Sequence, residues 1–342
     1  MNKVTDLALA VVIPVFNTEA YLKQCLDSIL AQSFRNFIIY AVDDGSTDNS
    51  LSILESYAKR DSRIKVIRKE NGGVSSARNI ALDHIESDRI CNWVTYIDSD
   101  DVISPDYFLN FYKIAVKNIE IEYICTSAIY FNNQGDFPLT YHFPEETILN
   151  KDQCFEHYFS DAAKQEIDPT IHLFIGNRFF KVKLIEGLRF PENVHCGEDQ
   201  IFMIHALNNI KKYGALSPRS IYKYRMRSSS LTHTLGKQAD TNFNLYSRIY
   251  FAQKNIIPNQ IMQKVYEKLI VYWWGLVKYS VLNNKLEKQQ QLKSVYSQII
   301  SDKHYQKLKF IYRLGDTAVR LYLKYISKQQ KTKPPVEESL FK

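Results

Sequence analysis

The chain has 342 residues, of which 45% are hydrophobic and 24% charged, a composition that supports a folded core and excludes a mostly disordered protein. Its length favours about two domains. With 11 Gly and 10 Pro and no long apolar run, collagen-like, low-complexity and membrane-spanning classes are not expected.

The formal net charge of +7 is concentrated near the C-terminus. Residues 303–333 carry nine Lys or Arg and one Asp, or +8, so the other 311 residues sum to −1. Because nucleic-acid binders usually carry positive charge on the folded domain, no nucleic-acid partner is expected. Segment 303–328 combines lysines with apolar residues at helical spacing, which fits peripheral contact with an anionic membrane or a helix packed on the protein.

The five cysteines are scattered and form no CxxC pair, which fits neither a disulfide framework nor a zinc site. The N-terminus lacks the basic start and small-residue cleavage site of a signal peptide. We therefore expect a cytoplasmic location, with the inner face of the plasma membrane as an option through segment 303–328.

The first hundred residues alternate between short apolar runs and segments with helical spacing. This pattern predicts strands over 9–13, 37–42, 64–68 and 93–97, and helices over 20–32, 48–59 and 74–85. Pro14 is expected to end the first strand. The alternation is typical of a parallel sheet with helices on both faces.

After residue 120 the alternation weakens. The pattern predicts strands over 123–130 and 221–225, helices over 181–185 and 199–207, and no regular element over 131–175. Long helices are predicted over 240–256, 259–284, 286–301 and 303–328. We expect an α/β domain over 1–236, a helical domain over 237–330 and a disordered tail over 331–342.

Polar and glycine residues follow each of the first four predicted strands, in groups that begin at Pro14, Asp43, Glu70 and Asp98. In open α/β sheets ligands bind beyond the carboxyl ends of the strands. The sequence therefore predicts a binding site at this edge.

The segment Asp98-Ser-Asp-Asp101 follows the fourth strand. Two carboxylates at positions i and i+2 can hold Mg²⁺ or Mn²⁺ while leaving room for phosphate oxygens. A solvated acidic turn, or a cap for the helix that starts near Pro105, explains the same residues equally well.

Two glycine-containing segments offer nucleotide contacts. In Asp43-Asp-Gly-Ser-Thr-Asp48 an Asp could accept hydrogen bonds from a base or ribose, or the segment could only cap the next helix. In Asn71–Asn79 the backbone N–H groups of Gly72-Gly73 and the Arg78 side chain could hold phosphate or ribose, or the glycines could only turn the chain. No G-x-G-x-x-G or P-loop pattern is present.

Two further polar segments follow. Gly197-Glu-Asp199 precedes a helix, and one of its carboxylates could be a general base, although acids are also simply favoured at helix N-termini. Arg225, Arg227 and His233 lie in or beside one polar loop and could meet phosphate or metal, although a lone His is more often structural.

Together these motifs resemble the family-2 glycosyltransferases of the GT-A fold, of the bacterial surface-polysaccharide type. The matching segments are 12–17, 42–48, 71–79 and 96–101. Their order and spacing match over 9–110, and Gly197–Asp199 with the loop to His233 extends the match to about 235. The resemblance implies a Rossmann-like mixed α/β sheet flanked by helices, with a nucleotide-sugar half (1–110) and an acceptor half (111–236), followed by an all-α region.

The resemblance also implies roles by position. Nucleotide-sugar contacts fall on Pro14, Phe16, Asn17, Asp43, Asp44, Gly72, Gly73, Arg78, Asp98, Ser99 and Asp100. Phe16 would stack on the base, and Asp44, in preference to Asp43, would bond uracil or ribose. Asp98, Asp100 and His233 would hold a divalent cation, Mn²⁺ or Mg²⁺, with Arg225 and Arg227 near the diphosphate. Asp199 would be the general base, with Glu198 beside it.

The implied activity is metal-dependent, inverting transfer of a sugar from a nucleotide-sugar, most often UDP-linked, to a hydroxyl of a saccharide or glycolipid acceptor in polysaccharide, capsule or lipo-oligosaccharide synthesis. One alternative is a sugar-phosphate nucleotidyltransferase, whose Gly-rich, basic N-terminal signature residues 11–20 lack. Another is a non-catalytic glycan-binding relative, against which the intact Asp98, Asp100, Glu198 and Asp199 argue.

Overall fold

A computed structural model describes residues 7–132, 135–136, 142–159, 174–192, 197–226 and 256–258. In chain order its elements are β1 (Leu9–Val15), α1 (Glu19–Leu30), β2 (Phe37–Asp43), α2 (Ser50–Ala58), β3 (Ile64–Arg68), α3 (Val74–Asp88), β4 (Trp93–Tyr96), β5 (Val102–Ile103), α4 (Tyr107–Lys117), β6 (Ile121–Asn132), β7 (Gly135–Asp136), β8 (Thr147–Leu149), α5 (Lys151–Phe159), β9 (Arg178–Lys181), α6 (Val182–Ile185), α7 (Glu198–Asn209) and β10 (Tyr213–Arg225).

The chain divides into two compact units, Met1–Ser230 with Asn255–Pro258, and Leu231–Lys254 with Asn259–Lys342. All of the elements named above belong to the first unit. The predicted boundary at 236, the tail 331–342 and, apart from residue 256, the predicted helices beyond 240 lie outside the described residues.

One mixed sheet forms the centre of the first unit, with strand order β3-β2-β1-β4-β9-β6-β10-β5, and with β7 on β6 and β8 on β10. Strands β1 to β4 pair in parallel. Strand β9 is antiparallel to both of its neighbours, β4 and β6, and β6 is parallel to β10. The expected mixed α/β sheet is confirmed.

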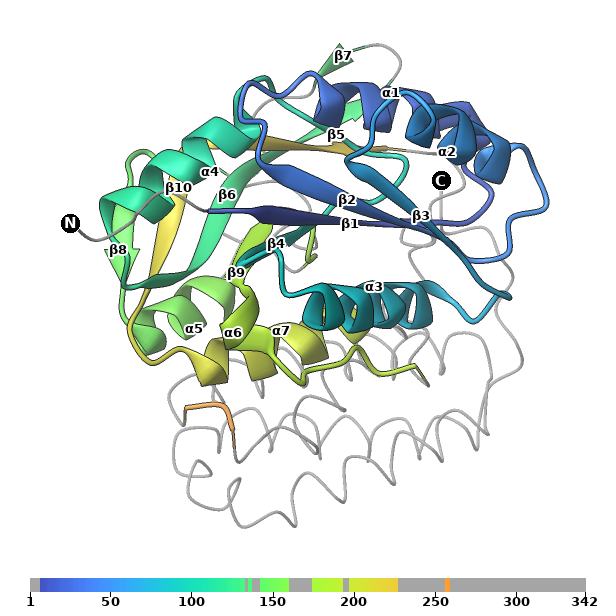
Figure 1. Cartoon of the computed structure of the whole chain (residues 1–342). Helices are drawn as coiled ribbons and strands as arrows, with labels where there is room; N and C mark the ends of the chain where they lie inside the picture. The colour runs from blue at the N-terminus through green and yellow to red at the C-terminus, as the bar shows by residue number, and fades with distance from the viewer. Residues whose placement is uncertain are drawn as a thin grey trace, which may run out of the picture. The chain divides into compact units, whose positions relative to one another are not determined.

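Helices cover both faces of this sheet (Figure 1). Helices α1, α2 and α4 lie on one face, and α3, α5, α6 and α7 lie on the other. All seven residues of β1 are buried, and α1 buries Leu22, Cys25, Leu26 and Ile29. These positions form one stripe of a 3.6-residue helix, and each fully buried aliphatic side chain contributes roughly 1.5–3 kcal/mol of hydrophobic stabilisation.

The expectation that Pro14 ends the first strand is wrong, because β1 continues to Val15. Successive residues of a strand point to alternate sides. The Val12 carbonyl accepts from Ile97 N on the β4 side (2.9 Å), and the Val15 carbonyl accepts from Asp44 N on the β2 side (2.8 Å). Pro14 therefore faces the β4 side, where the pairing with β4 ends at Val12, so its missing N–H leaves no ladder bond unmade.

The second half of the sheet contains elements that the sequence pattern did not predict. Helix α5 and strand β9 are short and aromatic, and β10 begins at Tyr213 rather than at residue 221. The register between β10 and β6 shifts between Ser217 and Ile221, around Pro218. This irregularity interrupts the alternation by which a strand is recognised from sequence.

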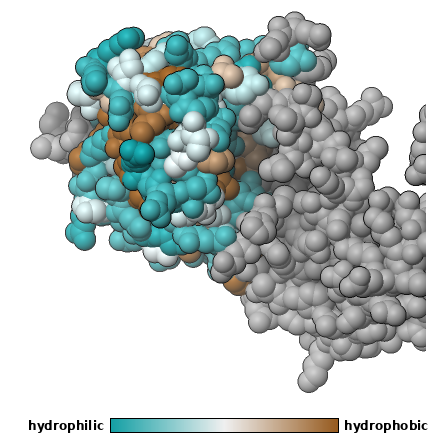
Figure 2. Space-filling view, turned by 90° about the vertical axis from the view of Figure 1, so that its right-hand side faces the viewer, coloured by the Kyte–Doolittle hydropathy of each residue, from teal (hydrophilic) through white to brown (hydrophobic). Residues whose placement is uncertain are grey.

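No helix in the described part of the chain is both long and apolar enough to cross a bilayer. The large hydrophobic residues exposed on its surface come from different elements and are Phe16, Val74, Ile90, Ile119, Ile148 and Tyr213. On the face shown in Figure 2, hydrophobic side chains lie in patches between hydrophilic ones. Scattered exposure of this kind is ordinary for protein surfaces.

Candidate active site

The loops that follow β1, β2 and β4 are tied together at the carboxyl edge of the sheet, as predicted. Asn17, at φ 52°, accepts from Thr47 N through its side-chain oxygen (2.8 Å). The Thr18 hydroxyl donates to Ser99 Oγ (3.0 Å). Pro14 and Ser99 are buried, whereas Phe16 is 47% exposed. The Phe16 ring is therefore exposed, as stacking on a nucleobase would require.

Asp44 holds the glycine loop that follows β3. Its Oδ1 accepts from Gly72 N (2.9 Å) and from Lys69 Nζ (2.5 Å), and its Oδ2 accepts from Gly73 N (2.8 Å). Gly73 has φ 87°, a conformation that favours glycine. Since each carboxylate oxygen has two acceptor positions, Oδ2 has one beyond its bond to Gly73 N, and 4% of the Asp44 side chain is exposed.

Asp43 lies beside Asp44 at the end of β2 and is fully buried. Neither of its carboxylate oxygens has a hydrogen-bond partner among the residues that the structure describes. An unpaired buried carboxylate is unfavourable by several kcal/mol as an order of magnitude, so such a group calls for a functional explanation.

Arg78 joins two motifs that are far apart in sequence. Its Nη2 contacts Asp98 Oδ1 at 3.0 Å and its Nη1 contacts Glu198 Oε1 at 3.1 Å, with only 4% of the Arg78 side chain exposed. Its guanidinium also lies over the Phe190 ring, 5.3 Å from the centroid. Burial alone would lower the pKa of Arg78, but Asp98, Glu198 and Asp199 raise it above its ordinary value, so the bridge stays charged.

Asp199 lies in the first turn of α7, which starts after Gly197 at φ 83°. Its Oδ1 accepts from Gln200 N (2.9 Å). Burial raises the pKa of Asp199 to about 8; the Glu198 charge adds to the rise and the Arg78 charge opposes it. A carboxylate whose pKa lies near neutral pH is suited to take up a proton during a reaction.

Asp98 and Asp100 are half-buried at the sheet edge, and Arg78 contacts only one oxygen of Asp98. Asp101 is 1% exposed and bonds inward, to the Tyr222 hydroxyl (2.6 Å) and Arg225 N (2.8 Å). The described residues contain no group of three or more His, Cys, Asp or Glu placed to hold a metal. Asp98 and Asp100 offer two carboxylates, so a cation there would need further ligands such as water and phosphate oxygens.

Arg225, for which a diphosphate contact was predicted, is bonded within the fold. The residue is 4% exposed, its Nε donates to the Asp100 carbonyl (2.6 Å), and its guanidinium lies over the Phe131 ring (4.3 Å). The side chain is therefore buried and engaged within the fold. Arg227 and His233 lie outside the described residues.

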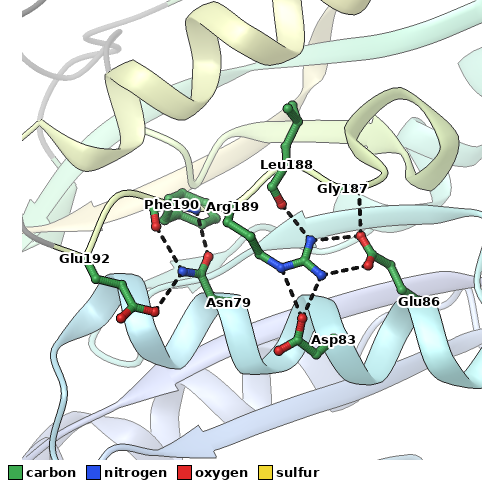
Figure 3. A network of polar contacts seen from close by, with 8 residues as sticks. All are labelled: Asn79, Asp83, Glu86, Gly187, Leu188, Arg189, Phe190 and Glu192. Atoms are coloured by element: carbon green, nitrogen blue, oxygen red, sulfur yellow. Dashed lines mark hydrogen bonds and ion pairs between the residues drawn. The ribbon is translucent and has the colours of Figure 1, made fainter.

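A polar network that the sequence did not reveal ties α3 to the segment before α7 (Figure 3). The Asn79 side chain accepts from Phe190 N (2.7 Å) and donates to Phe190 O (2.9 Å). Arg189 bonds both Asp83 and Glu86 of α3. The Phe190 ring stacks on Phe202 of α7 at 4.0 Å. Only Asn79 had a sequence signal, as the last residue of the glycine-loop motif.

Residues 10–188, slightly more than half of the chain, match the family model for glycosyl transferase family 2. The chain belongs to this family. The resemblance to family-2 glycosyltransferases seen in the motifs is confirmed.

Curated relatives agree with this family. GlyA of Streptococcus pneumoniae serotype 4 (strain ATCC BAA-334 / TIGR4), named a glycosyltransferase, is 33% identical over 235 residues, 66% of this chain and 32% of GlyA. EpsH of Bacillus subtilis (strain 168) is 32% identical, covering 72% of this chain and 70% of EpsH. The minor teichoic acid biosynthesis protein GgaB of the same strain is 30% identical, covering 72% of this chain and 26% of GgaB. The matched region thus spans about a third or less of GlyA and GgaB.

Solved structures share the fold. S. aureus TarS 1–349 in complex with UDP-GlcNAc has a TM-score of 0.64 at 21% identity, covering 86% of this chain and 81% of that one. The mannosyltransferase PcManGT from Pyrobaculum calidifontis, in complex with GDP-Man and Mn²⁺, has a TM-score of 0.56 at 13% identity, covering 94% and 84%. The α/β fold class predicted from the sequence is confirmed.

Proposed function

We propose that this glycosyltransferase is a metal-dependent, inverting enzyme that moves a sugar from a UDP-linked donor to a hydroxyl of a saccharide or glycolipid acceptor. The observation that carries the proposal is the buried Arg78 bridge between Asp98 and Glu198. It joins the carboxylate predicted for the cation to the turn that carries the predicted base, so both kinds of group belong to one site.

The nucleotide binds at the ends of β1 and β2. Phe16 offers an exposed ring for stacking on the base. Asp44 accepts a hydrogen bond from the base or ribose through the position left on Oδ2, and it holds Gly72 and Gly73 against the nucleotide. The unpaired oxygens of Asp43 beside it add acceptor capacity and negative potential. TarS has been solved with UDP and with UDP-GlcNAc, which supports a UDP-linked donor.

Asp98 and Asp100 would hold a divalent cation, Mn²⁺ or Mg²⁺; the predicted third ligand, His233, lies outside the described residues. When bound, this cation neutralises the negative charge that develops on the departing diphosphate. The Mn²⁺ in the PcManGT complex supports this assignment. Arg78 keeps Asp98 oriented through its bond to Oδ1, and Arg227 is proposed near the diphosphate.

Asp199 is the general base. A sugar hydroxyl is a weak nucleophile at neutral pH, so a carboxylate that removes its proton as the new bond forms accelerates attack. Single displacement from the face opposite the leaving group inverts the anomeric centre, as water attack does in inverting glycosidases. Glu198 is ion-paired with Arg78, so its charge is committed to the bridge, and the base role falls to Asp199.

The acceptor belongs to surface polysaccharide synthesis, such as capsule, teichoic acid or lipo-oligosaccharide. The name of GgaB, a teichoic acid biosynthesis protein, supports this class. We propose a cytoplasmic enzyme with a domain boundary near 236, whose basic segment 303–328 contacts the inner face of the membrane. Liposome co-sedimentation of the full chain against a chain that ends near residue 300 tests the membrane contact, and equal binding would reject it.

Release of free nucleotide from UDP-, GDP- and CMP-sugars tests the proposed activity. We expect slow hydrolysis of one UDP-sugar, which is abolished by EDTA and by Asp100→Ala. Hydrolysis that persists in EDTA would reject the cation. Absence of both hydrolysis and UDP binding by calorimetry would reject the nucleotide site itself.

A further inference from the structure

Loop 98–101 carries the proposed cation ligands, Asp98 and Asp100. It is anchored through its last residue, Asp101, whose carboxylate bonds inward. Asp101 N donates to the Asp98 carbonyl (2.9 Å), which closes the loop into a turn. The Asp101 carboxylate accepts from the Tyr222 hydroxyl on one oxygen and from Arg225 N on the other. Both partners belong to β10, so this strand holds the end of the loop.

The Tyr222 hydroxyl bridges the two ends of the same loop. It donates to Asp101 Oδ2 at 2.6 Å and accepts from Asp98 N at 3.1 Å. The Tyr222 side chain is fully buried. A Cβ atom at Gly176 would lie 2.6 Å from Tyr222 Cζ, so the ring is tightly enclosed. The enclosed ring holds the hydroxyl in place. Because Asp98 N donates to this hydroxyl, the loop backbone at Asp98 is held in place as well.

Arg225 fixes the third position of the loop. Its Nε donates to the Asp100 carbonyl at 2.6 Å, and its Nη2 donates to Gln24 of α1 at 2.5 Å. The guanidinium contacts the Phe131 and Tyr21 rings, 4.3 and 5.0 Å from their centroids. The backbone of Asp100 is therefore held by a rigid, buried donor.

Strand β10 also pairs with the strand that leaves the loop. Tyr222 lies opposite Ile103 of β5, and Lys223 lies opposite Val102. Strand β10 thus contacts Asp98, Asp100 and Asp101 of the loop, and also Val102 and Ile103, which follow it.

On the basis of the cation site proposed above, we propose that Tyr222 and Arg225 are positioning residues that set the placement of Asp98 and Asp100 as cation ligands. Outer contacts of this kind fix the orientation of metal ligands, and their removal typically lowers metal affinity about 10- to 100-fold.

The test compares Tyr222→Phe with Tyr107→Phe. Both tyrosines are fully buried and their rings pack edge to face, but the Tyr107 hydroxyl bonds Thr126 Oγ1 (3.1 Å) and not a residue of loop 98–101. Mn²⁺ affinity in the presence of UDP is measured by electron paramagnetic resonance of free Mn²⁺, and the melting temperature is measured in parallel. We expect Tyr222→Phe to weaken Mn²⁺ binding by about tenfold, and Tyr107→Phe to leave it unchanged.

Arg225→Lys provides a second, independent variant, since the single ammonium of lysine does not reproduce the fixed Nε and Nη2 donors that reach Asp100 and Gln24. We expect its Mn²⁺ affinity to fall in the same direction, with turnover partly recovered at saturating Mn²⁺. Wild-type Mn²⁺ affinity in both Tyr222→Phe and Arg225→Lys would overturn the positioning role. If the wild type bound no Mn²⁺ with UDP, or Asp100→Ala bound it normally, the proposed cation site itself would be wrong.

Discussion

The nucleotide side and the acceptor side of this site are held in different ways. On the nucleotide side, Asp44 bonds Gly72 and Gly73, 28 and 29 residues away, within consecutive loops of one parallel sheet. On the acceptor side, the turn with Glu198 is tied to α3 by Arg78, across 120 residues. A local network thus shapes the first half, whereas a few buried, long-range polar contacts position the second. Damage to α3 should therefore affect catalysis more than nucleotide binding.

Among the changes to contacts that join the two sides, Arg78→Lys should produce the largest effect, because an ammonium group cannot bridge Asp98 and Glu198 as the planar guanidinium does. Breaking a buried ion pair leaves uncompensated charge, so we expect unfolding free energy to fall by about 3 kcal/mol and kcat/KM to fall about 100-fold. Chemical denaturation and steady-state kinetics measure both.

Arg189→Lys is the matched control. Arg189 also bridges two carboxylates, Asp83 and Glu86, but it is 32% exposed and lies away from Asp98. Its kcat/KM should remain within about threefold of wild type, since exposed ion pairs contribute little. An equal loss in both variants would mean that the Arg78 bridge has no particular role in the site.

The raised pKa of Asp199 predicts a pH dependence of both activity and stability. Because the base acts deprotonated, kcat/KM should rise with pH until about pH 8. The folded protein binds a proton that the unfolded chain, with an ordinary pKa of 3.8, releases. Stability therefore falls as pH rises from about 4 to 8.

Asp199→Asn should remove this dependence. The wild type loses stability as pH rises from 5 to 8, and the variant should not. The free energy of unfolding of the variant minus that of the wild type should therefore increase by roughly 1–3 kcal/mol over this range, as measured by urea denaturation at the two pH values. A constant difference between the two proteins would show that the pKa of Asp199 is not raised.

Asn79→Ala should reduce kcat about tenfold while leaving UDP affinity unchanged, because it releases Phe190 and the segment before α7 but not the nucleotide loops. Asn209→Ala, which removes one bond to Leu184 O, is the control and should keep normal kcat. A loss of UDP affinity equal to the loss of kcat would contradict the separation of the two sides.

Gly73→Ala should give the smallest effect. Its φ of 87° and ψ of 168° are strained for alanine, but a Cβ there meets nothing within 4 Å, so we expect a loss of about 1–3 kcal/mol of stability and a few-fold loss of UDP affinity by calorimetry. Gly187→Ala has the same open surroundings at φ 75° and should lose stability alone. Equal UDP affinities would show that the glycine loop does not contact the nucleotide.

The same contrast explains what could be predicted from sequence. The parallel half was predictable, because its strands are continuous apolar runs and its loops carry Gly and Asp directly after them. The roles of Asp101, Tyr222 and Arg225 were not, because a buried tyrosine or arginine has the same local pattern whether it fills a core or holds a loop. The distinction lies in pairings across more than 120 residues, which no local spacing records.

The most direct test of the central claim compares wild type, Asp199→Asn and Asp100→Ala for UDP binding with Mn²⁺ and for sugar transfer or donor hydrolysis. We predict that Asp199→Asn binds UDP and Mn²⁺ normally but loses turnover by at least about 1,000-fold, and that Asp100→Ala loses Mn²⁺-dependent binding together with turnover. Turnover by Asp199→Asn near the wild-type rate would contradict the account.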